Sequence, residues 1–441
     1  MASLDHNKGS IIVQAGMGLG KTQAVGEYLK TQAEKYGVEN LIVVWPTFRK
    51  TLTIQNTHSM TSISGLPFES YLDMEPGPIS LVDHPFLCIQ YDSLGRLMGG
   101  APVPSSTKII LVCDEIVSLV SQMESPAGSP ALAMAVFQGL VEEACHILYL
   151  DANINNPVID VIKSFHTKAG RELPEFVINT YSRYKDNGTT MQEYTADDDT
   201  ALEAALYSKL DLRKNEERVG VMTSSRNKAN KLYHAILIKF PKLKVVVYTG
   251  DTPDDVRKKD FQDVDKAWQP YDVIIFNSVC EAGISCLLPV DNVFLFARAD
   301  LTTVRALYQL TGRFRRVKQI RYHIRTRACT MDCIDRLPID AEAILRQYTS
   351  GRRPIPTSCM AGVSYTPSVG ATFDADTPFA KILVANARHR NASAMAFSSL
   401  YRERCESAGI TMLDPDGTTM DQNKEFEVLV KKAQEKTRDA R

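Results

Sequence analysis

A glycine-rich run that ends in a lysine and a threonine lies near the start of the chain, at residues 14–23 (QAGMGLGKTQ). The apolar run 11–13 precedes it, and a helical pattern of apolar residues follows from Ala24. A strand, a glycine-rich loop and a helix in this order form a phosphate cradle. The glycines let backbone N–H groups turn toward a polyphosphate, and the helix N-terminus adds partial positive charge. The expected cradle residues are Ala15, Gly16, Gly18, Gly20, Lys21 and Thr22.

Two side chains of this cradle carry the expected chemistry. Lys21 would reach the β- and γ-phosphates of a nucleoside triphosphate, and the Thr22 hydroxyl would bind Mg²⁺. The first position of the loop is Ala15, where many phosphate loops have glycine. The alternative is a glycine turn with a chance Lys-Thr pair, which the flanking strand and helix disfavour.

Two carboxylates follow a second apolar run, residues 109–113 (IILVC). They are Asp114 and Glu115, and they lie where a buried strand would end. Asp114 would hold Mg²⁺ through water, and Glu115 would orient and deprotonate an attacking water molecule. The alternative is a strand-to-helix turn with an acidic N-cap.

The elements that must position these residues alternate between strand and helix along most of the chain. Short apolar runs predict parallel strands at 41–45, 87–90, 146–150, 219–222, 245–248, 273–276 and 293–296. A polar stretch, 181–199, predicts a linker between two such series. We expect an α/β protein with two parallel-sheet lobes. The expected segments are a first lobe (1–180), a linker with the start of the second lobe (181–212), a second lobe (213–330) and an irregular and helical accessory region (331–441).

Hydroxyl-bearing and basic side chains follow several predicted strands. In open α/β sheets ligands bind along the carboxyl edge, and such groups bind nucleic-acid phosphates. Candidates for this contact are Thr47, Arg49, Thr223, Ser224, Thr249 and Ser278. The alternative for each is a solvated loop. The segment 151–153 (DAN) is either a coupling segment or part of a helix cap that continues to Pro157.

The segment 309–316 (QLTGRFRR) places three polar side chains at helical spacing. If it is helical, Gln309, Arg313 and Arg316 share one face. The two guanidinium groups would stabilise the charge of a transferring γ-phosphate, which is the arginine-finger role. The alternative is a basic helix that faces solvent or a polyanion.

In order and spacing these segments resemble superfamily 2 helicases, whose core is two RecA-like lobes with ATP in the cleft between them. Within that superfamily the chain is most similar to the herpesvirus-type replication-origin-binding helicases, on segments 47–52, 90–94, 114–118, 150–153 and 282–285. The resemblance implies ATP and Mg²⁺ as ligands, adds Gly283 to the nucleotide-binding residues, and implies that Lys21, Glu115 and Arg316 converge on one triphosphate. Ser285 stands where many relatives carry Asp.

Composition limits the other possibilities. The chain has 441 residues, 44% of them hydrophobic, and a net charge of −1, so nucleic acid must be held by local groups. No apolar run is long enough to cross a membrane, and the N-terminus has no signal-like pattern. Nine scattered cysteines predict reduced thiols in an intracellular compartment, nucleus or cytoplasm, and the host nucleus for a viral protein. Cys329, Cys333 and His323 lack the spacing of a zinc site.

The accessory region is expected to pack on the second lobe, either as a structural brace or along a strand channel. The leading hypothesis is an ATP-driven translocase that separates nucleic-acid strands. We favour DNA over RNA, and expect single-stranded nucleic acid and replication proteins as partners. One alternative is a nucleotide-switched clamp or replication scaffold, against which Glu115 argues because a pure switch needs no water-activating carboxylate. Another is a nucleotide kinase, which would leave the segment 278–316 unexplained.

Overall fold

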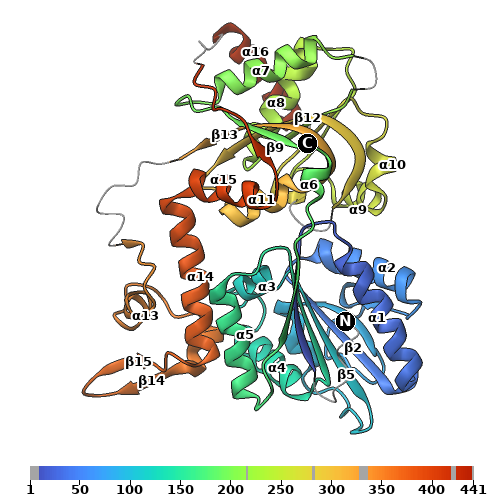
Figure 1. Ribbon diagram of the computed structural model, residues 1–441, viewed down its shortest axis with the longest axis vertical. Coiled ribbons are helices and arrows are strands. Elements are labelled where there is room, and N and C mark those ends of the chain that lie inside the picture. Colours follow the sequence, from blue (N-terminus) through green and yellow to red (C-terminus); the bar gives the residue numbers. More distant parts are fainter. Residues whose placement is uncertain (1–8, 215–216, 281–283, 327–335, 419–423, 440–441) are drawn as a thin grey trace. The chain divides into compact units, whose positions relative to one another are not determined.

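The computed structural model describes residues 9–214, 217–280, 284–326, 336–418 and 424–439 and is shown in Figure 1. The chain divides into two compact units. The described part of unit 1 comprises residues 9–181 and 336–391, and that of unit 2 comprises the rest. Each unit contains a seven-stranded parallel sheet with helices, which confirms the predicted fold class.

The unit 1 sheet has its central strands where the sequence predicted them. Its order is β3 (Glu69–Ser70), β4 (Phe86–Gln90), β2 (Leu41–Thr47), β5 (Lys108–Asp114), β6 (His146–Asp151), β1 (Ser10–Ala15) and β7 (Glu175–Asn179). Neighbouring strands are parallel throughout. The phosphate loop after β1 and the acidic pair after β5 therefore leave the same edge of the sheet, with β6 between these two strands.

The strands of unit 1 are apolar on both faces because helices cover both faces (Figure 1). On β5, Ile109, Leu111 and Cys113 join one hydrophobic cluster, while Ile110 and Val112 join another. The first cluster includes residues of α3 (Ile116–Gln122), α4 (Pro130–Glu143) and α5 (Asn156–Lys168). The second includes residues of α1 (Lys21–Tyr36) and α2 (Lys50–Ser64).

The segment 336–391 completes unit 1, so the prediction that the accessory region packs on the second lobe is wrong for this part. It contains α13 (Ala341–Thr349), an antiparallel hairpin of β14 (Val363–Thr366) and β15 (Gly370–Phe373), and most of α14 (Pro378–Met395). Ile344, Tyr348, Ile382 and Leu383 belong to the cluster that holds α3 and α4. The amino-acid pattern shows that these helices have an apolar side, but it does not say which helices that side contacts.

The unit 2 sheet takes its strands from three stretches of the chain. Its order is β10 (Val245–Tyr248), β11 (Val273–Phe276), β9 (Val219–Thr223), β12 (Cys286–Arg298), β13 (Phe314–Arg325), β8 (Thr190–Glu193) and β16 (Thr411–Met412). β8 lies inside the stretch that the sequence predicted as linker. β16 belongs to the C-terminal residues that return to this unit.

Helices also cover the unit 2 sheet. α7 (Thr200–Asp211) and α8 (Arg226–Lys239) share a cluster with β9, β11 and β12. α16 (Lys424–Asp439) contacts α8. The remaining helices are α6 (Arg183–Asp186), α9 (Asp254–Gln262), α10 (Val264–Trp268), α11 (Val304–Thr311) and α15 (Phe397–Ser407). Within the described ranges, no helix combines the length and the apolarity that a membrane crossing requires.

Candidate functional site

The phosphate loop joins β1 to α1 with the geometry that its glycines allow. Gly18 and Gly20 have φ of 74° and 76°, a region that side chains other than glycine rarely adopt. A Cβ on Gly16 would lie 3.3 Å from the Leu19 side chain. Lys21 is the first residue of α1, and its Nζ donates hydrogen bonds to the carbonyl oxygens of Ala15 (2.7 Å) and Gly16 (3.3 Å). The lysine amine thus lies over the loop that the sequence predicted as its cradle.

The acidic pair ends β5 and begins α3. Asp114 is buried, and its Oδ1 accepts a hydrogen bond from the backbone N–H of Glu115 at 3.0 Å. Burial, and next the charges of Glu115 and Asp151, raise the pKa of Asp114 to about 7, while the Lys21 ammonium opposes this rise. Because Lys21 acts on Asp114, the phosphate loop and the acidic pair belong to one electrostatic site in unit 1.

Glu115 has an unusual backbone conformation, with φ 54° and ψ 49°. It is the only non-glycine residue with positive φ among those described. This left-handed conformation costs a residue with a side chain about 1–2 kcal/mol, and such strain concentrates at functional sites. The turn lets the chain leave β5 and enter α3 within one residue, with Glu115 as the N-cap.

Asp151 fixes the start of α3. Its side chain is fully buried at the end of β6, next to β5. Oδ2 accepts a hydrogen bond from the backbone N–H of Val117 at 3.1 Å, and Oδ1 accepts one from Asn153 at 2.8 Å. Asn155, four residues later, caps α5 through Val158, as the helix-cap interpretation of this stretch predicts. Asp151 therefore positions the residues that follow Glu115.

The residues at this edge fit Mg²⁺ together with a polyphosphate. Mg²⁺ in such sites is held by one or two carboxylates and the substrate phosphates, which matches Asp114, the Thr22 hydroxyl and an open glycine loop. A cation would also favour the charged form of the buried Asp114 carboxyl. Among the described residues, no group of three or more His, Cys, Asp and Glu gathers as a metal site. Cys329 and Cys333 lie outside those residues.

The predicted nucleic-acid contacts of unit 1 differ in exposure. Thr47 is fully buried, and its hydroxyl lies 2.5 Å from the Thr53 hydroxyl, so its side chain holds the loop after β2 against α2. Arg49 is half-exposed and lies beside the Phe48 ring. Of the two, only Arg49 presents its side chain to solvent in this conformation.

The predicted contacts of unit 2 lie at the carboxyl edge of its sheet. Thr223 is buried and caps its own turn, because its hydroxyl accepts a hydrogen bond from Ser225 N–H at 3.0 Å. Ser224 accepts one from Arg298 N–H at 2.9 Å. The buried Thr249 accepts one from Asp251 N–H at 3.2 Å. Ser278 begins a short 3-10 turn after β11 and is half-buried. Gly283 lies outside the described residues.

The predicted helix over 309–316 is wrong. α11 ends at Thr311, and β13 begins at Phe314, so Gln309, Arg313 and Arg316 do not share a helical face. Arg313 is buried and donates to the carbonyl oxygens of Gln309 and Ile284, both at 2.9 Å. Arg316 is exposed on β13. Residues 314–325 form a strand because they pair with β12 and β8. This pairing with distant segments outweighs the helical spacing of the arginines.

Two features escaped the sequence interpretation, one in the C-terminal segment and one on β13. Ser358 and Asn386, both buried, donate side-chain hydrogen bonds to Met123 O (2.5 Å) and Val120 O (3.0 Å) at the end of α3. The buried His323 forms a 2.9 Å contact between its Nδ1 and the Tyr194 carbonyl. No sequence signal could have found these pairs, because more than a hundred residues separate the partners in each of them.

Solved structures define the class of fold. The Mycobacterium smegmatis helicase Lhr bound to ssDNA and AMP-PNP has a TM-score of 0.51 at 16% identity, over 92% of this chain and 54% of that one. S. cerevisiae Dbp5 bound to Gle1 and IP6 has a TM-score of 0.52 at 14% identity, over 98% of this chain and 90% of that one. The chain shares the fold of these two proteins, with two RecA-like α/β units in tandem.

Residues 1–339 match the family model described as origin of replication binding protein, and the chain belongs to this family. It is similar to a putative helicase/primase complex protein of African swine fever virus, at 27% identity over 71% of this chain and 28% of that protein. It is also similar to the replication origin-binding protein of human herpesvirus 6A, at 26% identity over 69% of this chain and 36% of that protein. The matched part thus spans only about a third of these relatives.

Proposed function

We propose that this chain is an ATP-dependent motor that moves along single-stranded nucleic acid, DNA in preference to RNA, and separates strands during replication. The observation that carries this proposal is that the phosphate loop with Lys21 and the acidic pair leave the same edge of the unit 1 sheet, separated by one strand. The names of the relatives, a putative helicase/primase protein and an origin-binding protein, support the link to replication.

Each residue of the site has a task in ATP hydrolysis. Lys21 exchanges its carbonyl partners, Ala15 and Gly16, for the β- and γ-phosphates. Glu115, at the left-handed turn between β5 and α3, orients and deprotonates the attacking water. Mg²⁺, held by Thr22 and through water by Asp114, would neutralise charge on the phosphates. In this scheme Arg316 stabilises the transition state, and Arg313 supports the loop that precedes β12.

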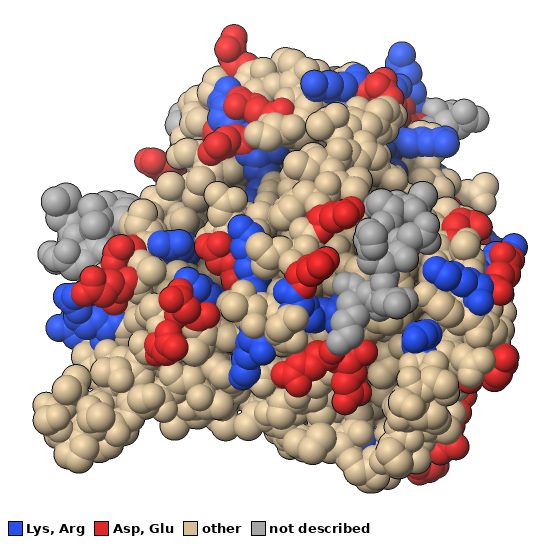
Figure 2. All heavy atoms as spheres, turned by 60° about the horizontal axis from the view of Figure 1, so that its bottom comes forward, with Lys and Arg blue, Asp and Glu red and all other residues tan. Residues whose placement is uncertain are grey.

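Local groups must hold the nucleic acid, because opposite charges mix over the described residues of the face shown in Figure 2. Phosphate contacts from strand-end loops make such binding independent of sequence and sensitive to salt. Arg49 and Ser278 are accessible candidates, and Ser224 lines an open cavity in unit 2. We also propose that the protein works in an intracellular, reducing compartment. The free, buried thiols of the described cysteines support this location.

The alternative function is a nucleic-acid clamp or replication scaffold that binds nucleotide without hydrolysing it. The strained conformation of Glu115 favours hydrolysis, because a switch has no use for a carboxylate held in this way. We expect Glu115→Gln to lower strand-stimulated phosphate release by about a hundredfold or more, since a general base contributes ~10²–10⁴ in rate. Affinity for an ATP analogue should stay within about twofold, measured by equilibrium titration.

Glu142→Gln is the matched control, because Glu142 is exposed on α4. It should hydrolyse ATP like the wild type. Strand displacement on DNA and RNA forks of both polarities then tests the motor itself. ATP-dependent displacement by the wild type that Glu115→Gln lacks supports the proposal. Unchanged hydrolysis in Glu115→Gln, or strand binding without any hydrolysis in the wild type, would support the clamp.

A further inference from the structure

A cavity of about 720 Å³ opens at the carboxyl edge of the unit 2 sheet. Its walls are the ends of β9, β12 and β13, the starts of α7 and α8, and one side of α16. Cavities of this size hold ligands in other proteins, and the carboxyl edge of a parallel sheet is where such ligands bind. We call it the edge cavity.

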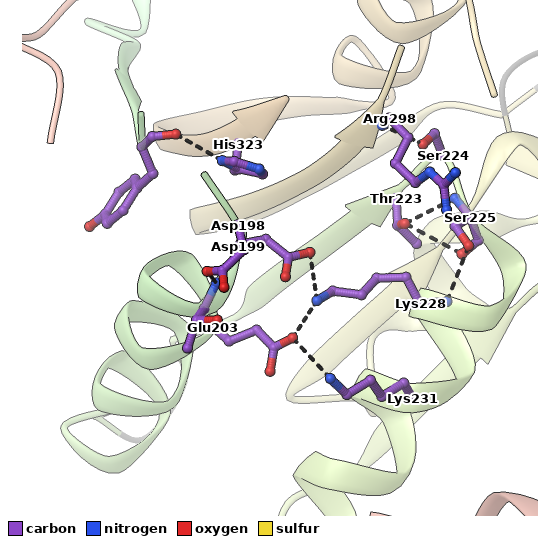
Figure 3. A network of polar contacts seen from close by, with 12 residues as sticks. Asp198, Asp199, Glu203, Thr223, Ser224, Ser225, Lys228, Lys231, Arg298 and His323 are labelled. Atoms are coloured by element: carbon purple, nitrogen blue, oxygen red, sulfur yellow. Dashed lines mark hydrogen bonds and ion pairs between the residues drawn. The ribbon is translucent and has the colours of Figure 1, made fainter. Parts of the chain in front are cut away.

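His323 lies in the wall of the edge cavity with one ring nitrogen still available. The residue is 4% exposed, and its Nδ1 lies 2.9 Å from the Tyr194 carbonyl oxygen. A carbonyl only accepts hydrogen bonds, so Nδ1 carries the hydrogen and Nε2 of the neutral ring is an acceptor. Nε2 has no hydrogen-bond partner among the described residues. Figure 3 shows the His323 ring reaching toward the side where Arg298 and Ser224 lie.

A buried acceptor without a partner is unfavourable, so a ligand that brings an N–H or O–H group to Nε2 would gain a hydrogen bond there. A second acceptor, the Asp198 carboxylate, also lines the cavity near His323. Phe296, buried at the end of β12, adds an apolar surface. The interior therefore suits a flat ligand that donates hydrogen bonds.

The two less exposed lysines of the cavity, Lys228 and Lys231, already pair with carboxylates (Figure 3). Lys228 forms ion pairs with Asp199 (2.7 Å) and with Glu203, and Lys231 forms one with Glu427 (2.7 Å). The side chains of both lysines are at most 27% exposed. The inner end of the cavity thus offers no free positive charge for a phosphate.

The rim is different, because its cations are exposed. Among the described residues, Arg226 pairs with Asp251 (3.1 Å) and Arg298 with Asp300 (2.7 Å), and the two arginine side chains are 58% and 47% exposed. Exposed pairs of this kind contribute little, so the guanidinium groups exchange partners readily. Two further exposed cations, Arg325 and Lys431, line the same opening, as does the exposed Glu435. The phosphates of a ligand would therefore bind at the rim of the edge cavity and not at its inner end.

We propose that the edge cavity takes one nucleobase of the bound single strand, with the base donating a hydrogen bond to His323 Nε2 and the flanking phosphates lying against Arg226, Arg298 and Arg325. The inference rests on the proposed function for strand binding, and it adds that unit 2 grips the strand by a base as well as by phosphates. Any base with an amino or imino N–H satisfies the acceptor, so the grip does not depend on sequence.

The test compares a base-bearing DNA strand with an abasic strand of the same length by fluorescence anisotropy. His323→Phe removes the acceptor and keeps a ring. We expect it to reduce the base-over-abasic affinity ratio by about threefold to tenfold, the worth of one buried hydrogen bond, with the affinity for the abasic strand unchanged. His323→Gln keeps an acceptor and an N–H group for the Tyr194 carbonyl, and should restore most of the ratio.

His166→Phe is the matched control. His166 is a buried histidine of unit 1 whose Nδ1 also meets a backbone carbonyl, that of Glu172 at 2.6 Å. Its Nε2 already has a partner, the Tyr149 hydroxyl at 3.1 Å. His166→Phe should therefore leave the base-over-abasic affinity ratio unchanged. Arg298→Ala should weaken both strands equally and reduce the salt dependence of binding.

A wild-type ratio in His323→Phe would overturn the inference, and so would equal losses for both strands, which would indicate a structural role only. If His323→Phe does not fold, the inference is tested with wild-type protein and a strand that contains the fluorescent base 2-aminopurine. Its fluorescence should rise when wild-type protein binds, because a base in the cavity has left its stack, and an unchanged signal would overturn the inference. Either of these results would overturn the inference without affecting ATP hydrolysis. If the wild-type protein binds no strand at all, the proposed function fails as well.

Discussion

At the scale of single residues, the candidate site is built from one strained and one buried carboxylate. Glu115 is held in the left-handed region by its neighbours: Asp114 accepts its N–H, and Asp151 accepts that of Val117. Asp114 is enclosed where β5 ends, and burial raises its pKa to about 7. Both residues make the folded protein less stable than it would be without them, which is typical of groups kept for chemistry.

The raised pKa of Asp114 gives a prediction about stability and pH. The folded state binds the proton of this carboxyl more tightly than the unfolded state, whose pKa is near 3.8. Stability therefore falls as the pH rises from about 4 through about 7. Asp114→Asn carries no such charge. In chelator-treated, nucleotide-free protein we expect it to raise the melting temperature clearly at pH 8 and much less at pH 5.

Asp416→Asn serves as the control for this pH series. Hydrogen bonds from Thr418 lower the pKa of the half-exposed Asp416, so Asp416 titrates below this pH range. The effect of Asp416→Asn on the melting temperature should therefore be the same at pH 5 and pH 8. An Asp114→Asn effect that is equally independent of pH would show that Asp114 is an ordinary ionised carboxylate, and would remove the electrostatic argument for the site.

At the scale of elements, the C-terminal segment of unit 1 anchors α3, the helix that starts at Glu115. Ser358 and Asn386 bind the last carbonyl groups of α3, and Arg390 of α14 forms an ion pair with Glu124 just beyond it. Burial raises the pKa of Glu124, and the Arg390 guanidinium opposes that rise. This part of the accessory region thus braces the helix that starts at Glu115.

Arg390→Ala tests this brace. It leaves the Glu124 carboxylate, whose side chain is 11% exposed, without its cation, and should destabilise unit 1 by about 1–2 kcal/mol in urea unfolding. Arg402→Ala removes an arginine from an exposed helical pair with Glu406 in unit 2 and should cost at most about 0.5 kcal/mol. Equal small effects of the two substitutions would mean that the contact with Glu124 is incidental.

The comparison between sequence and structure also belongs to this scale. The longer apolar strands, the phosphate loop and the acidic pair were predictable, because each is encoded within about ten neighbouring residues. Features set by distant partners were not predictable. Arg316 joined a strand, Thr47 turned its hydroxyl inward to Thr53, and the helices around Ile382 packed on unit 1. His323 became notable only because the fold brings Tyr194 to its ring.

At the scale of the whole molecule, we propose that unit 1 carries the nucleotide chemistry and that unit 2 supplies supporting charge and strand contacts. Lys21, Asp114 and Glu115 belong to unit 1, and Arg316 belongs to unit 2. Their convergence on one triphosphate stays a prediction. An exposed arginine on β13 is available for this role, whereas Arg313 is occupied by backbone carbonyls.

The most direct measurement is the steady-state rate of phosphate release from ATP, with and without single-stranded DNA, in the wild type and two variants. The strand should raise the wild-type rate several-fold. Lys21→Ala should abolish release but keep strand binding, and Arg316→Ala should lower kcat by about 10³ or more with little change in nucleotide affinity, because a finger acts in the transition state. A wild-type rate in Lys21→Ala, or a rate indifferent to the strand, would contradict the account.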